Sequence, residues 1–96
     1  MLPQGGFFMA STNHTILCYG LSTCIHCKHA REFLDQHKEM YKFIYVDLLE
    51  GEERNEALNK MRQYNPQLSF PTIIIDDGER VIVGFQREEL LQYLDL

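Results

Sequence analysis

Two apolar runs separated by a helix-length segment constrain the fold of this chain more than any other feature. The first run, "HTILCYG", covers residues 14–20, is rich in β-forming residues and ends at a glycine. The second, "YKFIYVD", covers residues 41–47. Between them, apolar residues recur at helical spacing from Cys27, so we expect a helix that runs to about Lys38. A strand, a helix and a strand in this order predict a right-handed crossover between two parallel strands.

The rest of the chain predicts a second helix, a hairpin and a terminal helix. An amphipathic segment follows residue 50 and ends at Pro66. The apolar runs "PTIII" and "VIV" are joined by Asp76-Asp77-Gly78, and an Asp-Gly pair is a strong hairpin-turn signal. "REELLQYLDL" then places leucines on one face of a last helix. The order β-α-β-α-β-β-α predicts an α/β fold with a four-stranded mixed sheet flanked by helices, in which strands covered on both faces are apolar nearly throughout.

Length, charge and composition narrow the function. The chain has 96 residues, which suffice for one domain, and we expect a flexible leader at 1–12 followed by a domain at 13–96. A net charge of −5, without a basic run, argues against nucleic-acid binding. No apolar run is long enough for a membrane span, and the N-terminus lacks the features of a signal peptide. We therefore expect a cytoplasmic protein, in which three cysteines do not suggest a structural disulfide framework.

The stretch "STCIHCKHA" lies where the first strand meets the following helix. It contains Cys24 and Cys27, and a Cys-x-x-Cys pair at such a junction indicates a redox motif. The spacing brings the two sulfurs together on the first helical turn, and the helix N-terminus favours the thiolate of Cys24. We expect Ser22 and Thr23 to cap this helix through their hydroxyl groups. Cys24 would attack a substrate disulfide, and Cys27 would then resolve the mixed disulfide.

Metal binding is the main alternative at this stretch, which offers four candidate ligands: Cys24, His26, Cys27 and His29. A structural zinc site normally needs a second pair of ligands, and the rest of the chain provides none. Haem attachment would require Cys-x-x-Cys-His, but Lys28 occupies the histidine position. We expect Cys18, in the middle of the first strand, to be a small core residue. The redox interpretation is therefore preferred, with no metal site assigned.

With these motifs in register, residues 14–96 resemble a glutaredoxin, the compact form of the thioredoxin fold. The resemblance is carried by "STCIHCK", by "FPT" at residues 70–72 and by "VGF" at residues 83–85. It implies that Pro71 is a cis-proline and that the preceding residue, Phe70, faces the active-site sulfur and pairs through its backbone with a bound peptide or glutathione. It also implies that the backbone at Gly84 approaches a ligand.

Three departures from the family pattern bear on the electron donor and the redox couple. Leu21 stands where many glutathione-using glutaredoxins carry a lysine. Gly84-Phe85 replaces the usual double glycine and resembles the glutaredoxin-like hydrogen donors of ribonucleotide reductase, which take electrons from a thioredoxin reductase. His26, just before the second cysteine, is similar to the histidine of protein disulfide isomerases. His26 and Lys28 are thus either modulators of the thiolate or solvent-facing residues of the first turn. Thr23, next to Cys24, is expected to act with them as a modulating residue.

The sequence therefore predicts a thiol-disulfide oxidoreductase of the glutaredoxin type with Cys24 as nucleophile and Cys27 as resolving thiol. We expect the backbone of Thr23, Phe70-Pro71-Thr72 and Gly84-Phe85 to form the substrate cradle. Its partners would be disulfide-containing proteins, with glutathione as a possible co-substrate and no bound cofactor, and we expect a monomer. Two alternatives stay open: a glutathione-independent, thioredoxin-like electron donor fed by a dedicated reductase, and a non-enzymatic protein that binds a metal or iron–sulfur cluster through Cys24 and Cys27.

Overall fold

The computed structural model describes residues 14–96, and the leader predicted at 1–12 lies outside this range. The elements are β1 (Ile16–Gly20), α1 (Ile25–Gln36), β2 (Lys42–Tyr45), the 3-10 turn η3 (Val46–Leu48), α2 (Gly51–Tyr64), β3 (Thr72–Ile75), the 3-10 turn η4 (Asp76–Gly78), β4 (Arg80–Val83) and α3 (Arg87–Leu94). The predicted order β-α-β-α-β-β-α is confirmed. Among the described residues, no helix combines the length and apolar character that crossing a membrane requires.

The four strands form one mixed sheet in the order β2-β1-β3-β4. β1 and β2 are parallel, with Cys18 opposite Phe43, as the crossover through α1 requires. β3 runs antiparallel to β1, and the tight turn at η4 returns the chain as β4. Asp76 and Asp77 of that turn have positive φ angles, which Asp tolerates better than most residues, so the predicted hairpin is confirmed. The parallel pair places the ends of β1 and β2 at the same edge of the sheet.

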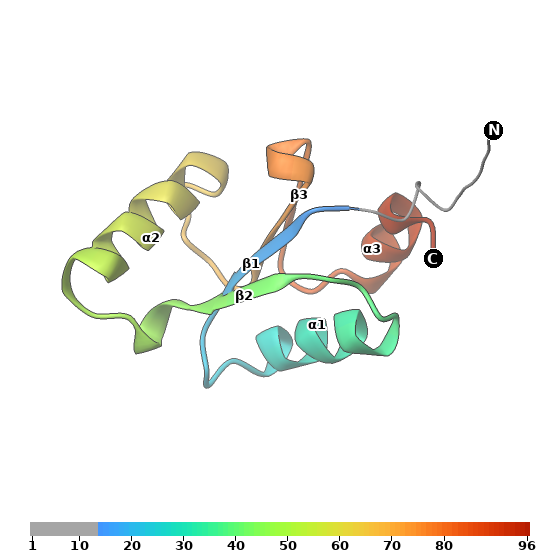
Figure 1. Ribbon diagram of the computed structural model, residues 1–96, viewed down its shortest axis with the longest axis horizontal. Coiled ribbons are helices and arrows are strands. Elements are labelled where there is room, and N and C mark those ends of the chain that lie inside the picture. The colour runs from blue at the N-terminus through green and yellow to red at the C-terminus, as the bar shows by residue number, and fades with distance from the viewer. Residues whose placement is uncertain (1–13) are drawn as a thin grey trace.

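Helices cover both faces of the sheet, with α1 and α2 on opposite sides of the strands (Figure 1). On one face, α1 and α3 pack against the central strands, and Leu34, Leu90 and Leu94 are fully buried there. On the other face, α2 inserts Met61 against Tyr19. Full burial of one such side chain contributes about 1.5–3 kcal/mol, so these two cores hold the three layers together. The segment between β1 and α1 emerges at one end of the sheet.

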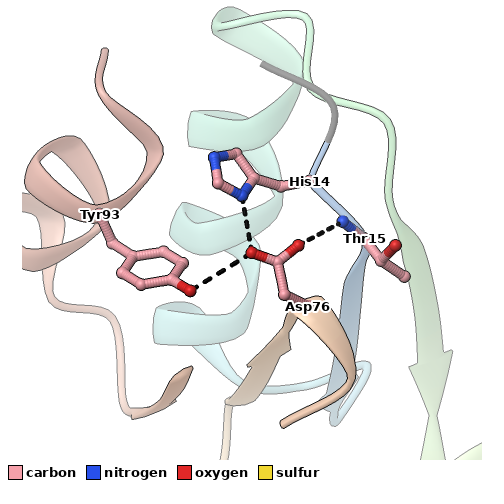
Figure 2. A network of polar contacts seen from close by, with 4 residues as sticks. All are labelled: His14, Thr15, Asp76 and Tyr93. Carbon is pink, nitrogen blue, oxygen red and sulfur yellow. Dashed lines mark hydrogen bonds and ion pairs between the residues drawn. The ribbon is translucent and has the colours of Figure 1, made fainter. Parts of the chain in front are cut away.

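A polar cluster ties three elements together at the opposite end of β1 (Figure 2). The carboxylate of Asp76 accepts hydrogen bonds from His14 Nδ1 at 2.9 Å, from the Thr15 backbone N–H at 3.1 Å and from the Tyr93 hydroxyl at 3.3 Å. These contacts, the hydrogen bond from His14 most of all, hold the pKa of Asp76 below its usual value. The cluster joins the start of β1, the β3–β4 turn and α3.

Candidate active site

Cys24 is the N-cap residue of α1, and its own sulfur caps the helix. Its backbone is extended, with φ −92° and ψ 121°, and its Sγ accepts a hydrogen bond from the backbone N–H of Cys27 at 3.3 Å. The prediction that Ser22 and Thr23 cap this helix is therefore wrong, since α1 begins at Ile25. The consequence for chemistry is that the sulfur of Cys24 sits at the positive end of the helix, where negative charge is stabilised.

Cys27 differs from Cys24 in burial. Its side chain is only 1% exposed, whereas Cys24 is partly exposed, and both are free thiols. The backbone N–H of Leu21 donates to Cys27 Sγ at 3.4 Å. Burial, followed by the hydrogen bond with Cys24, raises the pKa of Cys27 to about 12. The pair thus consists of one accessible sulfur and one protected thiol held next to it.

The turn that presents Cys24 is braced by an aspartate that sequence analysis missed. Asp47 Oδ1 accepts from the backbone N–H of Ser22 at 3.0 Å, and Asp47 Oδ2 accepts from the Ser22 hydroxyl. These hydrogen bonds lower the pKa of Asp47. A signal was available in the sequence, because Ser22 follows β1 and Asp47 follows β2, and parallel strands end at the same edge of a sheet. The hydroxyl expected to cap α1 instead fixes the turn before it.

Two of the three predicted cradle segments, Phe70-Pro71-Thr72 and Gly84-Phe85, lie next to each other. The Phe70–Pro71 peptide bond is cis, as the resemblance implied, and the carbonyl of Pro71 accepts from the backbone N–H of Gly84 at 2.7 Å. Gly84 has a φ of +83°, with open space where a Cβ would stand. The Phe85 ring packs against Phe33 of α1 with centroids 5.9 Å apart. The two predicted cradle segments are thus joined to each other and anchored on the helix that carries Cys24.

Thr72 is buried, and its side chain serves the loop before Pro71. The Thr72 hydroxyl donates to the Ser69 carbonyl at 2.8 Å and accepts from the Asn65 side-chain amide at 3.0 Å. Asn65 is 4% exposed and also donates to the Ser69 hydroxyl at 3.1 Å. The sequence indicated only that a helix ends near Asn65. The role of Asn65 could not be predicted, because its hydrogen-bond partner Thr72 lies seven residues later, in the next strand. Thr72 itself is fully buried in β3, between Tyr19 of β1 and Val83 of β4, so it orders the loop before Pro71 from below the surface.

The predicted modulating residues lie at the surface around Cys24. Thr23, His26 and Lys28 are all exposed. Lys28 and Cys24 both line a cavity of about 380 Å³, here called the Cys24 groove, whose other walls include Arg31, Glu32, Asp35 and Tyr45. The groove lies between α1 and the edge strand β2. It offers a polar surface next to the accessible sulfur.

Cys18 lies in the core, as predicted. It is fully buried in β1, among the side chains that α1 and α3 cover. Burial first, and then the nearby Cys27 thiol, raise the pKa of Cys18 to about 12. Within residues 14–96, no group of three or more His, Cys, Asp or Glu side chains is placed to hold a metal ion.

Comparison with known proteins identifies relatives that are similar in sequence and in structure. The family model described as Glutaredoxin matches residues 16–81. A solved methanoredoxin of Methanosarcina acetivorans is 37% identical, with a TM-score of 0.82 over 88% of this chain and 87% of that chain. A glutaredoxin from Methanosarcina mazei Go1 is 40% identical, with a TM-score of 0.78 over the same shares. A glutaredoxin from Archaeoglobus fulgidus is 35% identical, with a TM-score of 0.75 over 82% of this chain and 84% of that chain. A search of curated proteins returned no match.

Proposed function

The chain belongs to the glutaredoxin family, and from this premise we propose that it reduces disulfides in proteins or mixed disulfides with glutathione through Cys24 and Cys27. The observation that carries the proposal is the asymmetry of the two thiols. Cys24 is partly exposed at a helix N-terminus, and Cys27 is buried next to it with its backbone N–H on the Cys24 sulfur. An accessible nucleophile beside a protected resolving thiol is what a dithiol mechanism requires.

The proposed reaction transfers two electrons to the substrate. The Cys24 thiolate attacks one sulfur of the substrate disulfide, so that a Cys24–substrate bond forms and the substrate S–S bond breaks, which releases the first substrate thiolate. Cys27 then loses its proton and attacks Cys24, which forms the Cys24–Cys27 disulfide and releases the second substrate thiolate. Both released thiolates take up protons from solvent. Glutathione or a reductase returns two electrons to the chain for the next cycle.

Single cysteine substitutions test this proposal. Cys24→Ser is expected to abolish reduction of a small model disulfide and of a disulfide-bonded protein, because the attacking sulfur is gone. Cys27→Ser is expected to lose dithiol reduction and to accumulate a mixed disulfide at Cys24 that mass spectrometry detects. Cys18→Ala, which removes the third thiol, is the matched control and is expected to retain activity. Survival of dithiol activity in Cys24→Ser would exclude the proposal.

A second candidate concerns the electron donor. Leu21 offers an uncharged side chain beside Cys24, where many glutathione-using glutaredoxins carry a lysine, and this favours a thioredoxin-like donor fed by a flavin reductase. Reduction of the model disulfide should be measured in parallel with glutathione plus its reductase and with a thioredoxin reductase. Turnover only with the thioredoxin reductase would select the second candidate. Turnover with glutathione would show that Leu21 is tolerated.

The non-enzymatic alternative would need two chains, each of which contributes Cys24 and Cys27 to a shared metal or iron–sulfur cluster. Such a cluster absorbs visible light and is held by cysteine thiolates. Absorption spectra and metal analysis of the purified protein, next to the activity assay, distinguish a cluster from a colourless dithiol.

A further inference from the structure

We propose that the Cys24 groove binds a carboxylate of the disulfide substrate, and that Arg31 and Tyr45 recognise an acidic side chain about three residues from the reacting cysteine. This inference rests on the proposed function and names a substrate class for it: disulfides in acidic peptide segments. The argument depends on how Arg31 is held, on which hydrogen-bond donors stay free, and on the distance from Cys24.

Arg31 is held over the edge strand by aromatic residues. Its guanidinium lies 5.7 Å from the ring centroid of Tyr45 and 5.9 Å from that of Phe43. Arg31 Nη1 donates to the Tyr45 hydroxyl at 2.6 Å, and Nε donates to the Tyr41 hydroxyl at 3.2 Å. Two hydroxyl groups on one guanidinium limit its rotamers, so less conformational entropy is lost when it binds a ligand. The positive charge is therefore positioned before any substrate arrives.

The charge of Arg31 is not neutralised within the described part of the chain, where it forms no ion pair. Its hydrogen bonds are to neutral hydroxyl oxygens, Arg31 is exposed, and its remaining N–H groups form no hydrogen bond within residues 14–96. The Tyr41 hydroxyl donates its own hydrogen bond to Asp35 Oδ1 at 2.6 Å. The Tyr45 hydroxyl accepts from Arg31 but has no acceptor of its own among residues 14–96. Arg31 and Tyr45 thus present hydrogen-bond donors side by side, the arrangement that a carboxylate requires.

The free donors lie at the end of the groove nearest the reactive sulfur. Tyr45 pairs with Gly20, the last residue of β1, whereas Tyr41 and Asp35 lie toward the other end. Arg31 follows Cys24 by seven positions, which corresponds to about 10 Å along a helix axis. An extended peptide covers about 10 Å in three residues. A peptide whose cysteine reacts with Cys24 can therefore place its third residue at Arg31.

Three other charges on the groove adjust this preference: Lys28, Glu32 and Asp35. Asp35 accepts from the Tyr41 hydroxyl at the end of the groove away from Cys24. Its negative charge, like that of Glu32, opposes an incoming carboxylate. Lys28, one helical turn before Glu32, adds a positive charge between Cys24 and Arg31, while Glu32 adds a negative one. Glu32 forms no ion pair within residues 14–96, so its charge opposes an incoming carboxylate. Glu32→Gln should accordingly strengthen the preference for acidic substrates.

The test compares disulfide peptides that differ only at the third residue on either side of the cysteine, which is Asp, Asn or Lys. The chain is reduced chemically beforehand, and single-turnover rates are followed by mass spectrometry, so no reductase enters the assay. For an exposed charge pair, the wild type is expected to reduce the Asp peptide about two- to fivefold faster than the Asn peptide, with the Lys peptide slowest. The difference should shrink at high salt.

Variants assign the preference to the groove. Arg31→Gln should lose it and Arg31→Glu should reverse it, while rates for the Asn peptide stay within about twofold of wild type. Tyr45→Phe, which keeps the ring under the guanidinium, should show an intermediate preference. Arg62→Gln is the matched control, because Arg62 is an exposed arginine on α2, bonded to Asn59, on the opposite face of the sheet. Circular dichroism checks that each variant is folded.

The outcomes separate this inference from the proposed function. Loss of the Asp preference in Arg31→Gln but not in Arg62→Gln supports it. Equal rates for all peptides in the wild type, or an unchanged preference in Arg31→Gln, overturn it even where Cys24-dependent reduction proceeds. A further substrate is the mixed disulfide between glutathione and the Asn peptide. If Arg31→Gln reduces it two- to fivefold more slowly than the wild type does, the carboxylate that binds Arg31 belongs to glutathione, and the acidic-peptide assignment is overturned. Absence of any Cys24-dependent reduction would overturn the proposed function, and this inference with it.

Discussion

The side-chain amide of Asn65 donates a hydrogen bond to the hydroxyl of Thr72 at 3.0 Å, between the end of α2 and the start of β3. The same amide donates to the Ser69 hydroxyl, and the side-chain oxygen Oδ1 of Asn65 accepts from the backbone N–H of Gln67 at 3.2 Å. One buried side chain therefore shapes the loop that leads into the cis-proline. We therefore expect substrate binding at the predicted cradle to depend on Asn65, which is itself buried.

Asn65→Ala is expected to destabilise the protein by about 2 kcal/mol, because buried hydrogen-bonding groups of Thr72 and Ser69 lose a partner. Disulfide reduction should fall several-fold at a temperature where the variant is still folded. Urea denaturation measures the first effect and the model-disulfide assay the second. Asn59→Ala, at an exposed position of α2, is the control and should change neither. Equal stability of the two variants would contradict this account of the loop.

Gly20→Ala is expected to cost about 1–3 kcal/mol, as is typical of overpacking. A Cβ at Gly20 would lie 2.6 Å from Cε1 of the Phe43 ring and 3.1 Å from Cys27 Sγ. Thermal or urea unfolding gives the loss, and a double variant with Phe43→Leu, which removes the ring, should recover part of it. Strictly additive effects of the two substitutions would show that the contact with Phe43 is unimportant.

Alkylation of the folded, reduced protein with iodoacetamide near pH 7.5 should modify Cys24 alone. Cys18 and Cys27 are almost fully buried, and burial raises the pKa of both thiols to about 12, so neither offers an accessible thiolate. Peptide mass spectrometry identifies the modified residues. In denaturant, all three cysteines should react, which shows that the reagent can modify each of them once it is exposed. Modification of Cys27 as fast as Cys24 would refute the asymmetry of the pair.

The free energy of unfolding should fall at alkaline pH. Cys18 has a pKa of about 12 in the folded chain against 9.0 as the ordinary value, so above pH 9 the unfolded chain gives up this proton and the folded chain keeps it. Stability then decreases with rising pH by about 1.4 kcal/mol per pH unit for each such thiol, up to about pH 12. Urea unfolding between pH 8 and pH 10.5 should show a shallower decrease for Cys18→Ala. If the stability of wild type and Cys18→Ala falls with pH at the same rate, Cys18 has the same pKa in the folded and unfolded chains, and the prediction is wrong.

Asp76→Asn tests the cluster of Figure 2 at acid pH. The pKa of Asp76 is lowered in the folded protein, so its contribution is complete above the ordinary value of 3.8 and is lost as pH falls from there toward the folded pKa. At pH 7 the variant should be less stable by about 1 kcal/mol, because a hydrogen bond to a charged group is weakened. The difference between wild type and variant should shrink below pH 4. A difference that is constant down to pH 2 would refute this assignment.

Local patterns in the sequence predicted most of the fold. The apolar runs of β1 and β3 and the Asp-Gly turn are local signals, and the topology they imply is confirmed. The cap of α1 was predicted wrongly because the preference of serine for N-cap positions competes with a tertiary contact, and Asp47 takes the hydroxyl of Ser22. The cis bond before Pro71 could be expected only through the family resemblance.

The environment of the candidate site was less predictable. The positions of Cys24 and Cys27 followed from the motif, but the difference in their exposure depends on how α1 packs against the sheet. The contact of Arg31 with Tyr45 joins a helix to an edge strand, and no spacing rule within one element predicts it.

The sulfur that caps α1 is also the sulfur that would carry the substrate. When Cys24 forms a disulfide, the first turn of α1 loses or changes its thiol cap. The redox state of the chain and its free energy of unfolding are therefore coupled. A thermodynamic cycle makes the relation quantitative: the difference in unfolding free energy between the oxidised and reduced chains equals the difference in reduction potential between the folded and unfolded chains, at about 1.4 kcal/mol for 30 mV. Calorimetry on the oxidised and reduced chains therefore measures the same free-energy difference as the reduction potentials of the folded and unfolded chains.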